Sequence, residues 1–128
     1  MEHTLKEGLQ YTAIQKVMKK DTAAEHGSGL VEVFATPAMI ALMENAALKT
    51  VLPHLPKGYN TVGFAVNIKH LKPTPIGMEV KCTATLTNVE GKKLSFEVEA
   101  FDQEGKIGEG THIRYIIDNK KFMKNLTK

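Results

Sequence analysis

Residues 36–52 read TPAMIALMENAALKTVL, and this stretch decides the fold. Thr36 followed by Pro37 is the pattern of an N-cap residue with proline at the first helical position. Apolar side chains then recur at helical spacing until Pro53, which cannot continue a helix. Because they occupy most of the circumference, the sequence predicts a helix from about Thr36 to Leu52 that is buried rather than lying on the surface.

The chain after this helix reads as strands, because apolar and polar residues alternate in three stretches. The apolar positions are Val62, Phe64, Val66 and Ile68; Val80, Cys82, Ala84 and Leu86; and Leu94, Phe96, Val98 and Ala100. Each stretch predicts a half-buried strand. A weaker strand signal covers residues 9–17, and a last strand is expected over residues 107–117. Glu90-Gly91 and Glu104-Gly105 occupy hairpin positions, so the strands they join should be antiparallel.

A long buried helix among antiparallel strands needs an apolar cover, which the strands provide. The sequence therefore predicts an α+β fold in which an antiparallel sheet wraps around a central helix. The length of 128 residues fits one domain over residues 1–128.

Composition excludes several classes of function. The net charge of +3 comes from scattered lysines, without the arginine-rich stripe of a nucleic-acid binder. Cys82 is the single cysteine, and no histidine spacing indicates ligands, so we expect no disulfide, no metal and no cofactor. The N-terminus lacks an apolar signal segment, and no apolar run is long enough to span a bilayer. We therefore expect a cytoplasmic protein without a nucleic-acid or membrane partner.

A set of short landmarks adds a family resemblance to this picture. They are Val33-Phe34-Ala35-Thr36 leading into Leu42-Met43-Glu44, Val62-Gly63 leading to His70, the run from Pro73 to Gly77, Val89-Glu90-Gly91 and Gly110-Thr111-His112. From Leu9 to about Phe122 the chain resembles the hotdog-fold thioesterases, and within them the fluoroacetyl-CoA thioesterase group. The resemblance implies an acyl-CoA substrate and a homodimer joined at its sheet edges, with a higher oligomer as a further option.

The resemblance also implies functional residues. Thr36, Glu44 and His70 match the spacing of the family's catalytic residues, and Gly63 and Arg114 match positions that contact substrate. One departure is the run Gly27-Ser28-Gly29-Leu30, which stands where the specialised fluoroacetyl-CoA enzyme has aromatic lid residues. We therefore expect short acyl-CoAs to be hydrolysed about as well as fluoroacetyl-CoA.

Each catalytic candidate also has a structural interpretation. For Thr36 this interpretation is a purely structural role as the helix cap. Glu44 can lie on an exposed helix stripe, and His70, which shares its parity with the apolar row of its strand, can be a core residue. If Glu44 is functional, it and His70 make a usable acid/base pair. Eight helical positions put Thr36 and Glu44 roughly 12 Å apart along the axis, so the site is either extended or assembled from two subunits.

Three functions fit this site. The first is hydrolysis of a short acyl-CoA, with His70 and Glu44 activating water or a covalent step and Thr36 positioning the carbonyl or acting as nucleophile. A hotdog hydratase or dehydratase would use similar residues but release no thiol, and a binding module would show no turnover. His3, His26, His54 and His112 are weaker candidates. A place near the site in the last strand is a second interpretation of His112, but surface or packing roles are favoured for all four.

Overall fold

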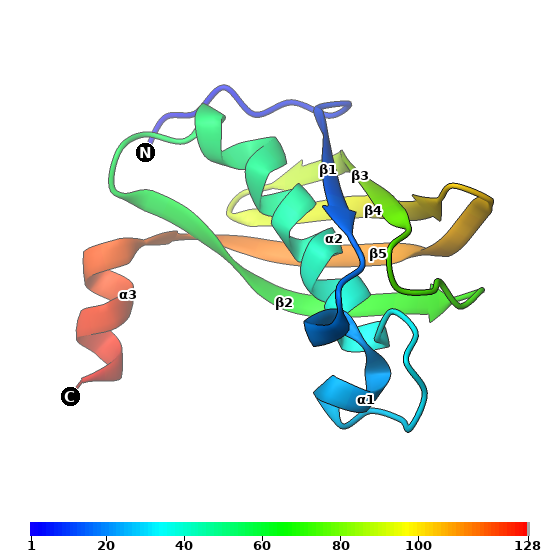
Figure 1. Cartoon of the computed structure of the whole chain (residues 1–128). Helices are drawn as coiled ribbons and strands as arrows, with labels where there is room; N and C mark the ends of the chain where they lie inside the picture. The colour runs from blue at the N-terminus through cyan, green and yellow to red at the C-terminus, as the bar shows by residue number, and fades with distance from the viewer. Residues whose placement is uncertain (128) are drawn as a thin grey trace.

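The computed structural model describes residues 1–127 as an antiparallel sheet curved around one long helix (Figure 1). The helix is α2 (Thr36–Val51), within one residue of the predicted end. The strands are β1 (Gln10–Lys16), β2 (Tyr59–His70), β3 (Glu79–Glu90), β4 (Lys93–Asp102) and β5 (Gly105–Asp118). They form a 5-stranded sheet in the order β1-β3-β4-β5-β2. The predicted α+β architecture is confirmed.

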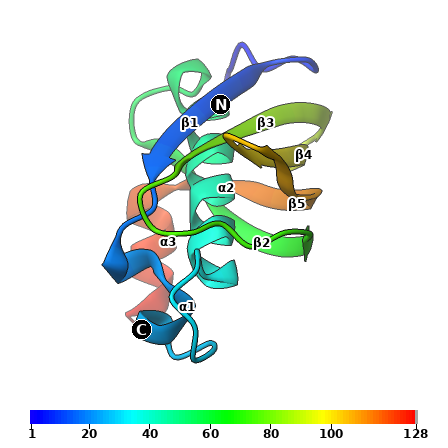
Figure 2. The same cartoon turned by 45° about the vertical axis from the view of Figure 1, so that its right-hand side comes forward.

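The core lies between α2 and the sheet, and Figure 2 shows the helix lying across the sheet's concave face. Met39 and Met43 are fully buried on the helix, opposite the predicted apolar rows of β3 and β4, which are fully buried as well. The predicted burial of α2 holds for most of its circumference, and one stripe of the helix remains open. That stripe is exposed and consists of Pro37, Ala41, Asn45 and Lys49.

Strand β2 differs from its prediction. It pairs only with β5 and forms a free edge of the sheet, with a register shift between Gly63 and Ala65. Phe64 is 70% exposed, and Val66 is exposed too. The predicted half-buried strand is therefore wrong for β2. The register shift interrupts its alternation, and Phe64 stays largely exposed although its ring packs edge-on against Tyr115 of β5, with centroids 5.1 Å apart.

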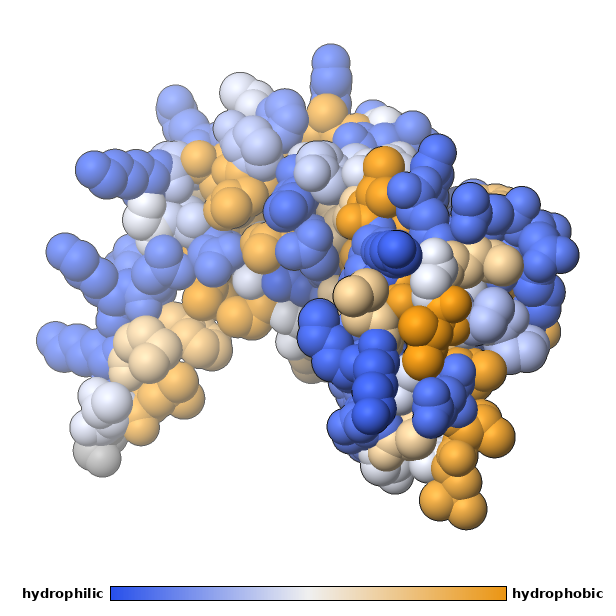
Figure 3. Space-filling view, in the orientation of Figure 1, coloured by the Kyte–Doolittle hydropathy of each residue, from blue (hydrophilic) through white to orange (hydrophobic). Residues whose placement is uncertain are grey.

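Two helices that the sequence did not predict project past the edge formed by β2. Helix α1 (Ala23–His26) lies near the end of β2, and α3 (Asn119–Leu126) lies near its start (Figures 1 and 2). The space-filling view shows a hollow between these two projections (Figure 3). Two 3₁₀ turns, η1 (Lys19–Asp21) and η2 (Leu52–His54), complete the elements.

Backbone hydrogen bonds fix the start of α2 beside the end of β2. Phe34 N–H donates to the Thr74 carbonyl and Ala35 N–H to the Asp21 carbonyl, both over 2.8 Å. Leu71 N–H donates to the Ile107 carbonyl over 2.7 Å. The segments before Thr36 and after His70 are thus held against each other and against the rest of the fold.

Candidate active site

Thr36 and His70 form a direct contact where α2 begins and β2 ends. Thr36 Oγ1 lies 2.8 Å from His70 Nδ1. The predicted capping role of Thr36 is wrong, because the helix begins at Thr36 itself and Ala35 is the N-cap. The threonine hydroxyl does not satisfy the helix backbone and is available to the imidazole. Such a hydroxyl–imidazole pair has the geometry of a nucleophile and its general base.

The surroundings of His70 keep its ring neutral. Burial lowers the pKa of His70 below 6.5, outweighing a backbone hydrogen bond at Lys72 that raises it. Its Nε2 atom is buried and has no hydrogen-bond partner within residues 1–127. A pocket of about 260 Å³ opens beside the ring, lined by Thr36, Phe34, Ser28 and Leu71 among others. A neutral histidine at the wall of a pocket is suited to accept a proton.

The N-terminus of α2 adds hydrogen-bond donors next to this pair. Ala35 has no side-chain cap, and Pro37 has no N–H to contribute. The first turn of a helix leaves N–H groups without an intrahelical partner and carries a partial positive charge. Thr36 therefore stands at a place that favours a developing oxyanion.

Glu44 lies in a different group, beside Gly63 of β2. A Cβ atom added to Gly63 would stand 2.7 Å from Glu44 Oε2. Glu44, Gly63, Phe64, Val66 and His112 line a small opening of about 170 Å³. The carboxylate occupies space that any side chain at position 63 would take. Within the described chain, no contact joins Glu44 to Thr36 or His70.

His112 and Arg114 are buried beneath Glu44 and Gly63. His112 Nδ1 donates to the Ala65 carbonyl over 2.8 Å, and Arg114 Nη1 donates to His112 Nε2 over 3.2 Å. Because a carbonyl only accepts and a guanidinium only donates, His112 is the neutral Nδ1–H tautomer. Burial lowers the pKa of His112, and the Arg114 charge lowers it further. Arg114 also donates to the Thr61 hydroxyl over 2.8 Å and the Thr61 carbonyl over 2.9 Å.

The sequence had assigned His112 a surface or packing role, and its buried place in this network agrees with packing. The link from His112 to Arg114 and Thr61 was not foreseen. One signal pointed to it, because His112 and Arg114 share their strand parity with the buried Ile116.

Comparison with known proteins decides the family. The family model described as fluoroacetyl-CoA-specific thioesterase matches residues 17–120. The chain belongs to this family. The fluoroacetyl-CoA thioesterase of Streptantibioticus cattleyicolor is 44% identical over 91 residues, which span 71% of this chain and 66% of that relative. The resemblance seen in the sequence is confirmed.

Solved structures agree with this membership. A crystal structure of a variant of the fluoroacetyl-CoA-specific thioesterase has a TM-score of 0.92 at 33% identity, covering 98% of each chain. A hypothetical protein of Thermus thermophilus, described as a thioesterase superfamily member, has a TM-score of 0.89 at 28% identity, covering 97% of this chain and 92% of that one. The hotdog fold and the activity class, thioester hydrolase, are thereby confirmed. Among residues 1–127 no helix is long and apolar enough to cross a membrane.

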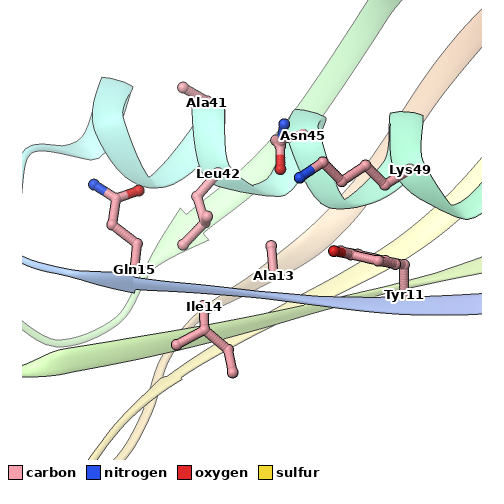
Figure 4. Close-up of a pocket in the computed structure, with 8 residues that line it drawn as sticks. All are labelled: Tyr11, Ala13, Ile14, Gln15, Ala41, Leu42, Asn45 and Lys49. Carbon is pink, nitrogen blue, oxygen red and sulfur yellow. The ribbon is translucent and has the colours of Figure 1, made fainter.

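Another cleft of the thioesterase contains none of the predicted site residues. It has a volume of about 360 Å³ and lies between α2 and β1 (Figure 4). Asn45 and Lys49 of the exposed α2 stripe line it, and the Lys49 ammonium lies 5.6 Å from the centroid of the Tyr11 ring. Thr36 and His70 instead line the opening of about 260 Å³. Glu44 and Gly63 line the opening of about 170 Å³. Both openings include residues of β2.

The contact between Gly63 and Glu44 gives a testable prediction for the thioesterase. Gly63→Ala should displace the Glu44 carboxylate and lower kcat/KM by roughly 10-fold or more, because a misplaced catalytic group is costly. Position 63 is exposed, so the free energy of unfolding should change little. In a Glu44→Ala background the same substitution should cost no further activity. An equal loss in both backgrounds would show that Gly63 acts independently of Glu44.

Proposed function

We propose that this thioesterase hydrolyses short acyl-CoAs at a site shared between two subunits. Thr36 and His70 of one subunit and Glu44 of the other make up the site, and Gly63 and Arg114 lie beside Glu44. The observation that carries the proposal is the 2.8 Å contact between Thr36 Oγ1 and His70 Nδ1. A related thioesterase whose crystal structure contains fluoroacetate and CoA supports the substrate class.

The contact supports the following chemistry. His70 Nδ1 takes the proton of the Thr36 hydroxyl while Oγ1 attacks the thioester carbonyl, and the N-terminus of α2 stabilises the oxyanion. The carbon–sulfur bond breaks and the departing CoA thiolate receives the proton from His70. Water then attacks the acyl-threonine ester while His70 takes a proton from it, the bond between the acyl carbon and Thr36 Oγ1 breaks as His70 returns that proton to Oγ1, and the free acid leaves. Glu44 stabilises the imidazolium that forms in each step.

The shared site follows from the distances within one chain. Gly63 and His70 stand at different points of β2, roughly 23 Å apart at the rise of an extended strand. Glu44 therefore does not reach the His70 of its own chain. A two-fold axis that pairs β2 with its copy runs the two strands antiparallel, so the part of one strand that carries Gly63 lies toward the part of the partner's strand that carries His70.

Pairing at β2 also accounts for the exposed residues of this strand. A free edge with accessible backbone groups and exposed Phe64 and Val66 is a template for another strand. A second copy satisfies those groups and covers the apolar side chains, which supports a homodimer. Cys82 is the single cysteine of the sequence and is buried, so the chain relies on no disulfide of its own, which supports placement in the reducing cytoplasm.

The first prediction from this function is release of free thiol from acetyl-CoA, propionyl-CoA and fluoroacetyl-CoA. Because residues 27–30 supply no aromatic side chain to the pocket, a fluoromethyl and a methyl group should be distinguished poorly. The kcat/KM values should then lie within roughly tenfold of one another. Measurement of thiol release over this panel would contradict the proposal if no acyl-CoA released thiol, as for a hydratase or a binding module.

A second prediction concerns pH. The pKa of His70 lies below 6.5 because the ring is buried, so the catalytically useful neutral form should already predominate at pH 7. We expect kcat/KM to rise as His70 loses its proton and to reach a plateau by neutral pH. Because the partner's Glu44 carboxylate stabilises the imidazolium and so raises this pKa, Glu44→Gln should move the acid limb to lower pH as well as reduce its amplitude. An acid limb whose position Glu44→Gln leaves unchanged would contradict the pairing of Glu44 with His70.

A third prediction tests how the subunits share the site. Glu44→Gln and His70→Ala should each lower turnover by roughly 10²-fold. In a mixed dimer of these two variants, one site retains Thr36 and His70 from one chain and Glu44 from the other. An equal mixture should therefore regain about a quarter of normal turnover after subunit exchange.

The matched control is a mixture of Thr36→Ala with His70→Ala. The sequence alone left open whether these residues come from opposite chains, and the 2.8 Å contact between Thr36 Oγ1 and His70 Nδ1 of the same chain supports a site that takes both from one chain. Each site of their mixed dimer therefore lacks one of the two, and activity should not return. Recovery in this mixture, or none in the Glu44→Gln mixture with exchange confirmed by mass spectrometry, would refute the shared site.

A further inference from the structure

Helix α3 carries an apolar face that the chain leaves uncovered. Phe122, Met123 and Leu126 lie three and four positions apart and share one side of the helix. Leu126 is 65% exposed and Met123 is exposed as well, whereas Phe122 is half-buried. Lysines 120, 121 and 124 occupy the opposite side. A short helix of this kind gains most of its stability by packing its apolar side on another surface.

A second uncovered apolar patch lies at the other projection. Leu30 is 97% exposed and Val31 is exposed, between α1 and α2. Ser28 and Val33 of the same segment line the pocket next to His70. The patch therefore lies at the rim of the pocket in which the thioester would be attacked.

The two patches lie at opposite ends of β2. Asp118 immediately precedes α3 and pairs with Tyr59, the first residue of β2. The segment that carries Leu30 is tied to the chain that follows β2, because Val33 forms a β-bridge with Pro75. Both projections extend past the free edge on either side of the hollow (Figures 1 and 3). Within one chain the two patches cannot meet.

A two-fold axis at the β2 edge exchanges these ends. When β2 pairs antiparallel with its copy, Tyr59 at the start of one strand and the α3 that lies beside it come near the end of the partner's β2. We infer that α3 of each subunit packs Met123 and Leu126 on the partner's Leu30 and Val31, and so forms a wall of the partner's acyl pocket. This inference rests on the shared site proposed above.

Charge and chemistry support a second copy of the chain as the molecule that covers the apolar face of α3. The segment with Leu30 carries exposed Glu25 and Glu32, and α3 carries three exposed lysines on the side opposite its apolar face. Opposite charges of this kind orient two surfaces and contribute little to affinity. The wall supplies apolar side chains that the run Gly27-Ser28-Gly29 lacks, so the partner helix keeps water from the pocket and narrows it.

Cysteine cross-linking tests the placement without relying on activity. Leu30→Cys combined with Met123→Cys should form a disulfide between subunits under mild oxidation, seen as a covalent dimer on a non-reducing gel. Cys82 is fully buried and can stay in place. Each single variant, and Leu30→Cys combined with Lys121→Cys on the far side of α3, should remain uncross-linked. A dimer in solution with no cross-link in the first pair would overturn the inference and leave the shared site standing.

Kinetics test whether the wall serves the pocket. Met123→Gln with Leu126→Gln should raise KM for short acyl-CoAs roughly tenfold while the protein stays dimeric by ultracentrifugation. The matched control, Lys121→Gln with Lys124→Gln, should keep near-normal kinetics because exposed charges contribute little. If Met123→Gln with Leu126→Gln left the kinetics unchanged, α3 would not form a wall of the partner's pocket. A cross-linked dimer that releases no thiol would support the α3 contact and refute the proposed hydrolysis, so the two failures are distinguishable.

Discussion

Burial of one side of α2 on the curved sheet is the constraint on which the rest of the structure depends. Met39 and Met43 are fully buried on this side, opposite the apolar rows of β3 and β4. A close-packed helix has no freedom to slide or turn, so every other residue on it has a fixed position. Thr36 and Glu44 are therefore held at a separation of roughly 12 Å along the helix axis. The division of the site into two groups is a consequence of core packing.

The contact between Thr36 and His70 depends on how the chain enters α2. Phe34 and Ala35 donate to the carbonyls of Thr74 and Asp21, which places the first helical turn against the end of β2. Thr74 is in turn buried, and its hydroxyl donates to Asp102 over 2.9 Å. Because these bonds position the backbone, the hydroxyl of Thr36 does not have to cap the helix and remains available to the imidazole. The fold thus brings Thr36 and His70 together, and the helix loses only a side-chain cap at its N-terminus.

The sequence predicted the parts of the fold that depend on local pattern. Helical spacing located α2, strict alternation located the buried rows of β3 and β4, and glycine positions located the hairpins. It misplaced Thr36 by one helical position, because Thr-Pro is compatible with a helix that begins at either residue. It also assigned β2 a covered face, since alternation records which residues are apolar and not whether a neighbour exists. Helix α3 was missed because its eight residues carry three lysines and lie beyond the last strand.

The errors at β2 and α3 have one physical cause, which also explains why the proposed catalytic residues lie apart. A pattern of apolar residues encodes every surface that the protein buries, including surfaces buried against another molecule. Phe64 on the strand, Leu30 on the loop and Leu126 on the last helix are all exposed along one side of the chain. The same side carries both halves of the proposed site. The half with Thr36 and His70 lacks a carboxylate, because the Glu44 of its own chain lies too far away. The exposed apolar residues and the two separated halves of the proposed site thus lie at the same edge of the sheet. This is the arrangement expected if one contact between two copies both covers the apolar residues and completes the active site.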